Sequence, residues 1–287
     1  MALVTECARR LAPNRRVVRD VQGVSLLLPW SHRLPDFADR HPTYGRNLVA
    51  VAEAIASCTP GRWTMVDVGA NVGDSALQVL ARVDADVLCV EGDPRWLEYL
   101  RFNVAFDQRI SIEPSLVVVD GSNAVLTPVR SHGTTTFLPG GPGRNASIRQ
   151  VLADELPARH TGLAPVRLVK SDTDGFDTRI VPGLAGAWRD DRPALFFEYD
   201  PALSRAAGDP DPSAVWTGLA DLGYTDVGVW NNRGEAMMWL DIGAVQGAET
   251  VLDLPQGRRG YHYWDVCVVG PDDPARGAIH DLVERSG

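Results

Sequence analysis

From residue 63 onward, short apolar runs alternate with segments of helical periodicity, and this order constrains the fold more than any other feature. The pattern predicts strands at 63–69, 86–93, 166–172 and 194–200 and helices at 74–83, 94–106 and 178–186. Parallel strands need a crossover between them, usually a helix. The order therefore predicts an α/β fold with a mostly parallel, doubly wound sheet.

Three apolar runs near the C-terminus follow one another without a helical segment. They cover residues 225–232, 235–241 and 261–270, and only the turn sequence NNRG separates the first two. Strands joined by so short a turn pair antiparallel. We therefore expect an antiparallel edge on the otherwise parallel sheet.

Two further regions lie outside this alternation. Residues 1–60 read as an N-terminal extension, with a strand within 23–30 and a helix within 44–57 that we expect to pack on the core. Residues 61–287 would form the core domain. A loop-rich insertion around 127–165 interrupts it and reads either as a flap over a site or as a surface insertion.

Composition excludes several classes of protein. The chain of 287 residues carries 28 basic and 37 acidic side chains, a net charge of −9, which argues against a nucleic-acid partner because phosphates need a basic surface. No apolar run approaches the roughly 20 residues that span a bilayer, and the first residues lack the apolar region of a signal peptide. The four cysteines have no paired spacing, which argues against a zinc site and a disulfide framework. We expect a cytoplasmic protein without a membrane partner.

A glycine-containing turn joins the first predicted strand to its helix, in the sequence MVDVGANVGDS (65–75). Gly69 and Gly73 allow a tight turn and close approach to a ligand. Asp67 ends the first strand and Glu91 the second, where an acid can accept the hydroxyls of a ribose. Neither GxGxxG nor GK[ST] is present, which disfavours a pyrophosphate or triphosphate ligand. The pattern suggests S-adenosylmethionine (SAM), which has an ammonium, a sulfonium and a ribose but no phosphate.

A second motif, LVKSDTDGFD (168–177), contains Lys170, the only lysine of the chain, followed by three acids. The strand delivers Asp172 and Asp174 to the carboxyl edge of the sheet, where either could remove a proton as a general base. Lys170 would keep such close carboxylates ionised or bind the acceptor. A divalent metal ion held by these two acids is an alternative. Asp177 reads as an acid that heads the next helix.

Three segments, VDVGANVGDSALQVL, VEGDPRWLEYLRFNV and LVKSDTDGFDTRIVPGL, together resemble the FkbM family of SAM-dependent methyltransferases. The resemblance covers roughly residues 63–200. It implies a class I methyltransferase (Rossmann-like) fold, with a seven-stranded, mostly parallel sheet and an antiparallel C-terminal strand. It also implies methyl transfer to a hydroxyl of a small molecule, such as a sugar or a secondary metabolite of antibiotic biosynthesis.

The resemblance also assigns a cofactor site. It implies SAM-binding roles for Asp67, Gly69, Ala70, Asn71, Gly73, Glu91, Gly92, Ser115 and Leu116. The first five would surround the methionine part, Glu91 the ribose, and the last two the adenine. The chain departs from the family pattern at Gly92, where proline is usual, at Ser171, where an apolar residue is usual, and at Asp174, where glutamate is more common.

Further residues are candidates for the acceptor side. Glu198 and Tyr199 end the strand after the second motif and would border the same cleft, and His262 could reach in as a base from the C-terminal strand. The acids Asp172, Asp174 and Glu198 would equally suit N-methylation of an aminated sugar. Two other classes stay open: an NAD(P)-dependent oxidoreductase, which the missing GxGxxG disfavours, and a non-catalytic binding protein. The sheet edge and the N-terminal extension could support a homodimer.

Overall fold

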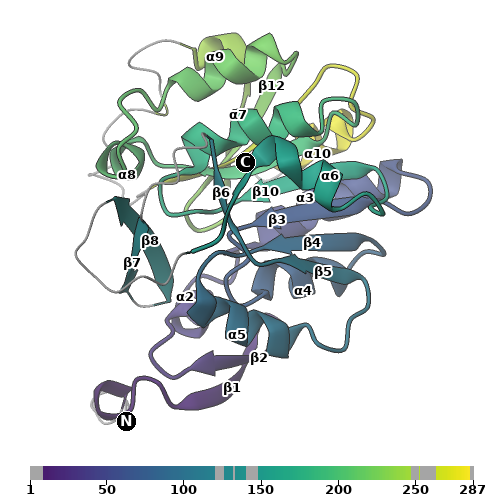
Figure 1. Ribbon diagram of the computed structural model, residues 1–287. Coiled ribbons are helices and arrows are strands. Elements are labelled where there is room, and N and C mark those ends of the chain that lie inside the picture. The colour runs from purple at the N-terminus through teal and green to yellow at the C-terminus, as the bar shows by residue number, and fades with distance from the viewer. Residues whose placement is uncertain are drawn as a thin grey trace.

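The computed structural model describes residues 9–119, 126–131, 133–139, 148–246, 252 and 263–284. Its centre is a sheet of eight strands in the order β13-β12-β14-β11-β10-β3-β4-β5 (Figure 1). The strands are β3 (Thr64–Val68), β4 (Asp86–Val90), β5 (Ile110–Glu113), β10 (Val166–Ser171), β11 (Ala194–Tyr199), β12 (Asp226–Asn231), β13 (Ala236–Asp241) and β14 (Trp264–Val269).

The pairing of these strands confirms the predicted fold class. Strands β5, β4, β3, β10 and β11 are parallel neighbours, and β14 lies antiparallel between β11 and β12. The sheet has one strand more than the seven expected, because β13 pairs antiparallel with β12 at the edge. Strand β14 is the antiparallel C-terminal strand that the family resemblance implies.

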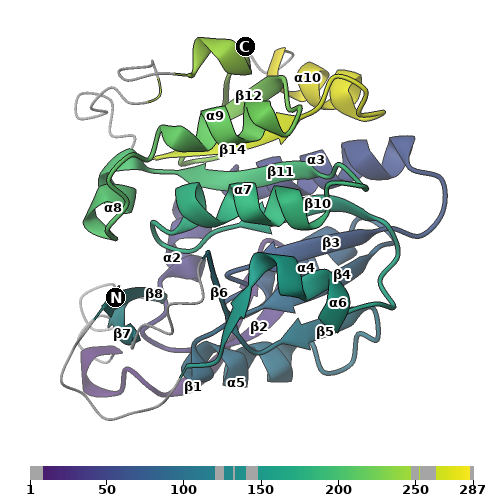
Figure 2. The ribbon, with the colours of Figure 1, turned by 45° about the horizontal axis from the view of Figure 1, so that its top comes forward.

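Helices cover both faces of the sheet. One face carries α3 (Arg46–Cys58), α4 (Asp74–Leu80), α5 (Pro94–Asn103) and α10 (Arg276–Glu284), and the other carries α7 (Asp177–Ala187) and α9 (Ala214–Asp221). Figure 2 shows α7 in front of β10 and β11, with α3 behind the sheet. Successive strand residues serve opposite layers: Met65 packs with the α3 side and Val66 with the α7 side. Alternation in a strand buried on both faces explains its continuous apolar run.

The N-terminal segment packs against the helix layer. Strands β1 (Arg16–Val21) and β2 (Val24–Pro29) form an antiparallel hairpin, followed by α2 (Leu34–Arg40). The side chain of Asn103 on α5 accepts from the Leu27 amide at 2.8 Å and donates to the Leu27 carbonyl at 3.2 Å, which ties β2 to α5.

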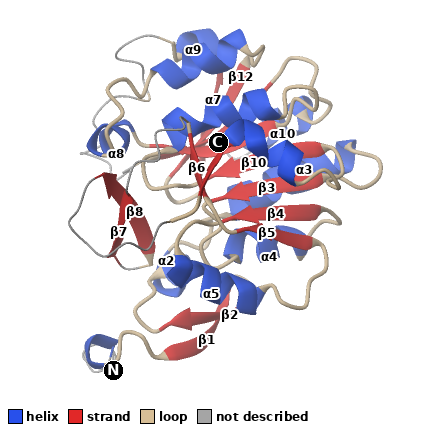
Figure 3. Ribbon diagram, viewed as in Figure 1, coloured by secondary structure: helices blue, strands red, loops and turns tan. Residues whose placement is uncertain are grey.

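The insertion contains regular structure. Strands β7 (Leu126–Ser131) and β8 (Thr134–Pro139) form a hairpin, and β6 (Leu116–Val118) pairs in parallel with β9 (Gln150–Leu152). Figure 3 shows the hairpin at one side of the molecule, beside the ends of the sheet strands. The short elements are η1 (Ala153–Glu155), α6 (Leu156–Arg159), α8 (Pro201–Ala206) and η2 (Ile242–Ala244). Among the helices of the described residues, none combines the length and the apolar character needed to cross a membrane.

Candidate active site

The two sequence motifs meet at the carboxyl ends of β3 and β10. These strands are parallel neighbours, with Asp67 opposite Lys170. The turn after β3 is tight: Gly69 has a φ of +75°, and a Cβ at Gly69 would lie 1.9 Å from the carbonyl oxygen of Asp172. Only glycine permits this contact, so the glycine turn and the acidic motif form one surface.

Glu91, at the end of β4, is fixed by two backbone amides. Its Oε2 accepts a hydrogen bond from Asn71 N–H at 2.8 Å and its Oε1 accepts from Asp93 N–H at 2.6 Å. Burial raises the pKa of Glu91 to about 7, although both amides favour the ionised form. The carboxylate is thus held in one orientation between the turns that follow β3 and β4, and its remaining lone pairs can accept ligand hydroxyls.

A small cavity, which we call the cofactor cavity, lies in front of Glu91 and has a volume of about 50 Å³. Six of the residues predicted to bind cofactor line it: Gly69, Asn71, Glu91, Gly92, Ser115 and Leu116. A Cβ at Gly92 would lie 2.8 Å from the Leu116 Cβ, so glycine at this position lets the β4 end approach β6. Val117 and Phe137 add an apolar wall.

The other three predicted cofactor residues lie behind the turn. Asp67 is completely buried and does not line the cavity, and Ala70 belongs to the core on the α3 side. A Cβ at Gly73 would lie 2.8 Å from Leu100 Cδ1, so its glycine allows α4 to pack against α5. These residues support the turn without lining the cavity.

Lys170 is buried with Asp67. Its Nζ lies 2.9 Å from Asp67 Oδ1 and 3.7 Å from Asp172 Oδ2, and it donates a hydrogen bond to the Gly69 carbonyl at 3.2 Å. Burial alone would lower the pKa of Lys170, but the adjacent carboxylates, Asp67 foremost, outweigh it and raise the pKa. The lone lysine therefore neutralises the buried Asp67 and anchors the glycine turn.

The acids of the second motif have different environments. The side chain of Asp172 is 49% exposed, whereas Asp177 is buried, heads α7 and accepts the Ser171 hydroxyl at 2.6 Å. Asp174 has a φ of +52°, a backbone conformation that aspartate tolerates better than most residues. Burial and the neighbouring Asp172 raise the pKa of Asp174 to about 7. Ser171 stands where the family pattern usually has an apolar residue, and its hydroxyl has Asp177 as its hydrogen-bond partner.

The β7–β8 hairpin covers the cofactor cavity. The Thr135 amide donates to Asp174 Oδ2 at 3.1 Å, and its hydroxyl donates to Asp93 Oδ2 at 2.8 Å while accepting from Trp96 Nε1 at 2.7 Å. Arg130 adds two hydrogen bonds of 2.6 Å to Asp93. Thr135 and Phe137 of this hairpin therefore line the cofactor cavity.

A larger cavity, which we call the acceptor cavity, adjoins the first and has a volume of about 510 Å³. Gly69, Asn71, Asp172 and Asp174 line both cavities. The remaining charged or aromatic lining includes Lys170, Phe196, Glu198, Asp265, Tyr263 and Tyr44. The acceptor cavity therefore reaches the cofactor cavity at the acids of the second motif.

One predicted acceptor-side residue, Tyr199, does not reach this cavity. Tyr199 is completely buried on the opposite face of β11 and packs on Trp216, with ring centroids 4.9 Å apart. Since neighbouring strand residues point to opposite faces, Glu198 and Tyr199 cannot both line one cleft, and the expectation for Tyr199 is not met. His262 lies outside the described residues.

Sequence reasoning missed the residues that complete both cavities. Thr135 and Trp96 roof the cofactor cavity, and Tyr44 and Asp265 line the acceptor cavity. Asp93, which accepts hydrogen bonds from Thr135 and Arg130, did give a local signal, because an aspartate before proline is typical of a helix N-cap, and it caps α5 here. The others come from distant segments, and nothing in their local sequence marks them.

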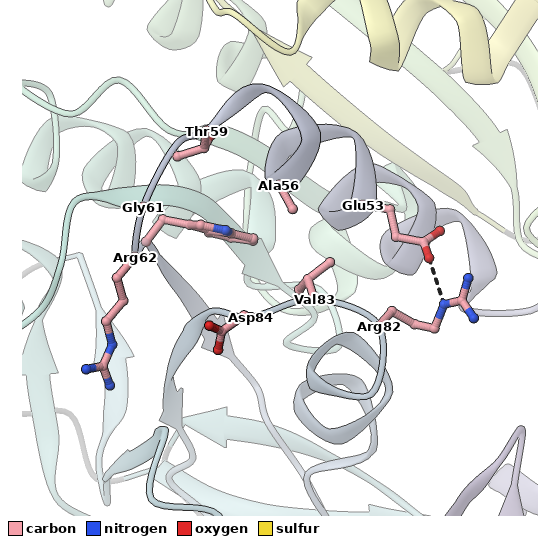
Figure 4. A pocket seen from close by; sticks show the side chains of 9 residues that line it. Glu53, Ala56, Thr59, Gly61, Arg62, Arg82, Val83 and Asp84 are labelled. Carbon is pink, nitrogen blue, oxygen red and sulfur yellow. Dashed lines mark hydrogen bonds and ion pairs between the residues drawn. The ribbon is translucent and has the colours of Figure 1, made fainter.

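Within the described ranges, no group of three or more acidic, histidine or cysteine side chains is arranged to hold a metal ion, so Asp172 and Asp174 lack a third ligand there. A hollow of about 820 Å³ at the amino-terminal edge of the sheet is lined by charged residues, including Arg62 and the Arg82–Glu53 pair (Figure 4). It contains none of the predicted site residues.

Comparisons with known proteins find similarity of fold. The sequence matches no protein-family model and no curated protein. The chain is similar to a putative transferase from Pyrococcus horikoshii (13% identity, TM-score 0.44, 90% of this chain and 73% of that chain). It is also similar to precorrin-6y C5,15-methyltransferase from Geobacter metallireducens (11% identity, TM-score 0.39, 77% of this chain and 86% of that chain). A third similar structure is a putative RNA methyltransferase from Pyrococcus horikoshii (10% identity, TM-score 0.39, 94% of this chain and 97% of that chain). These likenesses concern the fold alone.

Proposed function

We propose that this protein is a SAM-dependent methyltransferase of the FkbM type that methylates a hydroxyl group of a small molecule. The observation that carries the proposal is the meeting of two cavities at Asp172 and Asp174. One cavity presents a fixed carboxylate and an apolar wall, and the other is large enough for a small acceptor. Ligand cavities of about 300–1,000 Å³ are usual for small molecules.

The residues of the cofactor cavity fit SAM. Glu91 offers carboxylate lone pairs to a ribose, Leu116 and Val117 offer an apolar surface to a flat ring, and the cavity carries no basic side chain for a phosphate. The volume of about 50 Å³ is too small for the whole cofactor. Binding therefore requires displacement of the hairpin residues Thr135 and Phe137. SAM supplies a methyl group on a positively charged sulfur, which a nucleophile can displace in line.

The residues of the second motif have separate roles in the proposed reaction. Asp172 lies on the border of both cavities with an accessible carboxylate, so it can accept the proton of an acceptor hydroxyl as general base. Bound SAM would supply the methyl group to the deprotonated oxygen, and the electron pair of the carbon–sulfur bond would stay on sulfur. Lys170 holds the turn that positions these groups. Asp174 orients the hairpin through Thr135.

Two alternatives make different demands on the site. N-methylation needs an amine near Asp172, and the acidic lining of the acceptor cavity favours binding of an amine. An NAD(P)-dependent oxidoreductase needs a place for a pyrophosphate, for which this glycine turn has no fingerprint. The acidic lining also supports a small-molecule acceptor over a nucleic acid.

Thermal unfolding with S-adenosylhomocysteine (SAH), SAM, NADH and NADPH in parallel tests the proposal. A ligand at 100 times its Kd stabilises the native state by about 2.7 kcal/mol, so binding raises Tm. We expect a shift with SAH and SAM and none with the nicotinamide cofactors. Glu91→Gln is the matched variant, because it keeps the shape and weakens ribose binding. If NADH or NADPH raised Tm and SAH and SAM did not, an oxidoreductase would become the proposed function in place of the methyltransferase.

A further inference from the structure

The acceptor cavity brings together acids from three neighbouring strands. Glu198 on β11 and Asp265 on β14 are direct cross-strand partners in the antiparallel pair, and Asp172 follows β10 on the other side of β11. All three line the cavity. Like charges placed directly opposite each other destabilise a sheet, so this arrangement costs stability unless a proton or a bound cation offsets the negative charge.

The basic groups around the cavity pair with acids other than Glu198 and Asp265. Lys170 lies 2.9 Å from Asp67 and 3.7 Å from Asp172, and Arg33 lies 3.2 Å from Asp36. His32, the third basic side chain of the lining, is buried, which lowers its pKa to about 4 and leaves it neutral. Among the described residues, no cation forms an ion pair with Glu198 or Asp265.

The excess of negative charge affects the acids themselves. Burial and then the surrounding carboxylates, Asp172 first, raise the pKa of Glu198 well above its ordinary value. Burial likewise raises the pKa of Asp265 to about 7, against the hydrogen bond that Asn47 donates at 2.7 Å. Asp74 and Asp200 lie on the same lining and add to the negative field. A bound cation would relieve this repulsion.

Aromatic side chains stand beside the same acids. Tyr44, from the N-terminal segment, and Tyr263, before β14, line the cavity. Burial raises the pKa of both phenols. Among titratable neighbours, Asp172 acts most on Tyr44, and Tyr44 followed by Glu198 acts most on Tyr263. A carboxylate pair flanked by aromatic rings is suited to a protonated amine, which forms charge-assisted hydrogen bonds and is attracted to ring faces.

We propose that the acceptor is a small hydroxylated molecule that carries a protonated amine, with Glu198 and Asp265 binding the ammonium while Asp172 faces the hydroxyl. The inference rests on the proposed function, because it takes this cavity as the acceptor site. It assigns to Glu198 and Asp265 a role in specificity, and to the N-terminal segment, through Tyr44 and Asn47, a share of the acceptor site.

Isothermal titration of the full chain saturated with SAH tests the inference. The probes are two pairs of sugars, glucosamine with glucose and galactosamine with galactose, which differ by an ammonium in place of a hydroxyl. A hydrogen bond to a charged group contributes about 1.5–3 kcal/mol, so we expect each amino sugar to bind at least tenfold more tightly than its partner. The difference should shrink as salt is added.

Substitutions of Glu198 and Asp265 test whether these two acids cause the preference for amino sugars. Glu198→Gln and Asp265→Asn should each reduce the preference for the amino sugar to threefold or less, whereas Asp84→Asn, whose side chain is 97% exposed on the far edge of the sheet, should leave it unchanged. Retained SAH binding shows that a variant is folded. If SAH does not bind the wild type, the proposed function fails. If SAH binds but the amino sugars bind no better than the neutral sugars, the inference is overturned and the proposed function stands.

Discussion

The backbone amide of Thr135 donates a hydrogen bond to the carboxylate of Asp174 over 3.1 Å. This contact joins the β7–β8 hairpin to the second sequence motif and closes the cofactor cavity to about 50 Å³. It gives Asp174 a role that its position beside Asp172 does not reveal, since one of its oxygens holds the hairpin. Cofactor binding and hairpin position are therefore expected to be coupled.

Loosening the hairpin should speed cofactor association. Thr135→Val removes a hydroxyl that joins Trp96 to Asp93, and leaves the Trp96 N–H without this acceptor. We expect the free energy of unfolding to fall by about 1–3 kcal/mol and the association rate of SAH to rise severalfold. Stopped-flow tryptophan fluorescence measures the rate. Thr136→Val, on the opposite face of the same strand, is the control, and an unchanged rate in Thr135→Val would argue against a hairpin that must move.

Asp172→Asn should separate binding from turnover. The substitution keeps the size of the side chain at the border of the two cavities and removes its ability to accept a proton. Loss of a general base lowers turnover by about 100-fold or more, while the SAH-induced Tm shift persists. Turnover is measured once an acceptor is known, as SAH release. Turnover close to that of the wild type would move the role of base to another residue.

Lys170 and Asp67 should behave as one unit. Lys170→Met leaves Asp67 buried without its cation, which we expect to cost about 3–5 kcal/mol of unfolding free energy. The double variant with Asp67→Asn should recover most of that loss, because no charge is then stranded. Urea unfolding of the single and double variants measures the coupling. Additive losses in this cycle would mean that Lys170 acts chiefly on Asp172 instead.

Gly69 and Gly208 allow steric and backbone effects to be separated. Both have positive φ, +75° and +93°, but a Cβ at Gly69 would meet the Asp172 carbonyl at 1.9 Å, whereas nothing lies within 4 Å at Gly208. Gly208→Ala should cost about 1–2 kcal/mol from the left-handed conformation. Gly69→Ala should cost more and abolish SAH binding. Equal costs, with SAH binding retained, would show that β3 and β10 can separate without harm.

The pH dependence of stability should report Asp265. Its pKa of about 7 in the folded protein lies above the ordinary value of 3.8, so the unfolded chain loses this proton first as pH rises. The stability that the protonated form gives below pH 4 is lost as pH rises to about 7. At pH 8, Asp265→Asn should therefore have a free energy of unfolding at least ~1.4 kcal/mol above that of the wild type, the equivalent of one pKa unit. Urea unfolding measures this difference. The gain should vanish near pH 4, and a gain independent of pH would contradict this assignment.

The sequence by itself determined the order of strands and helices, the glycine turn and the acids at the strand ends. These follow from local rules: periodicity distinguishes a strand from a helix, and residues that follow parallel strands gather at one edge of the sheet. Gly69, Glu91 and Asp172 could be placed near each other on that basis. The short turn at NNRG predicted an antiparallel edge, and the family resemblance implied that the C-terminal strand, β14, would be antiparallel.

Only the tertiary structure decided which of these residues contact one another. It paired Lys170 with Asp67 across two strands, and not chiefly with the acids that follow it in sequence. It turned Tyr199 into the core and set Asp265 opposite Glu198. Local periodicity fixes which residues share a face, but the neighbour of that face depends on strand order and on packing between segments far apart in the chain, which no local pattern encodes.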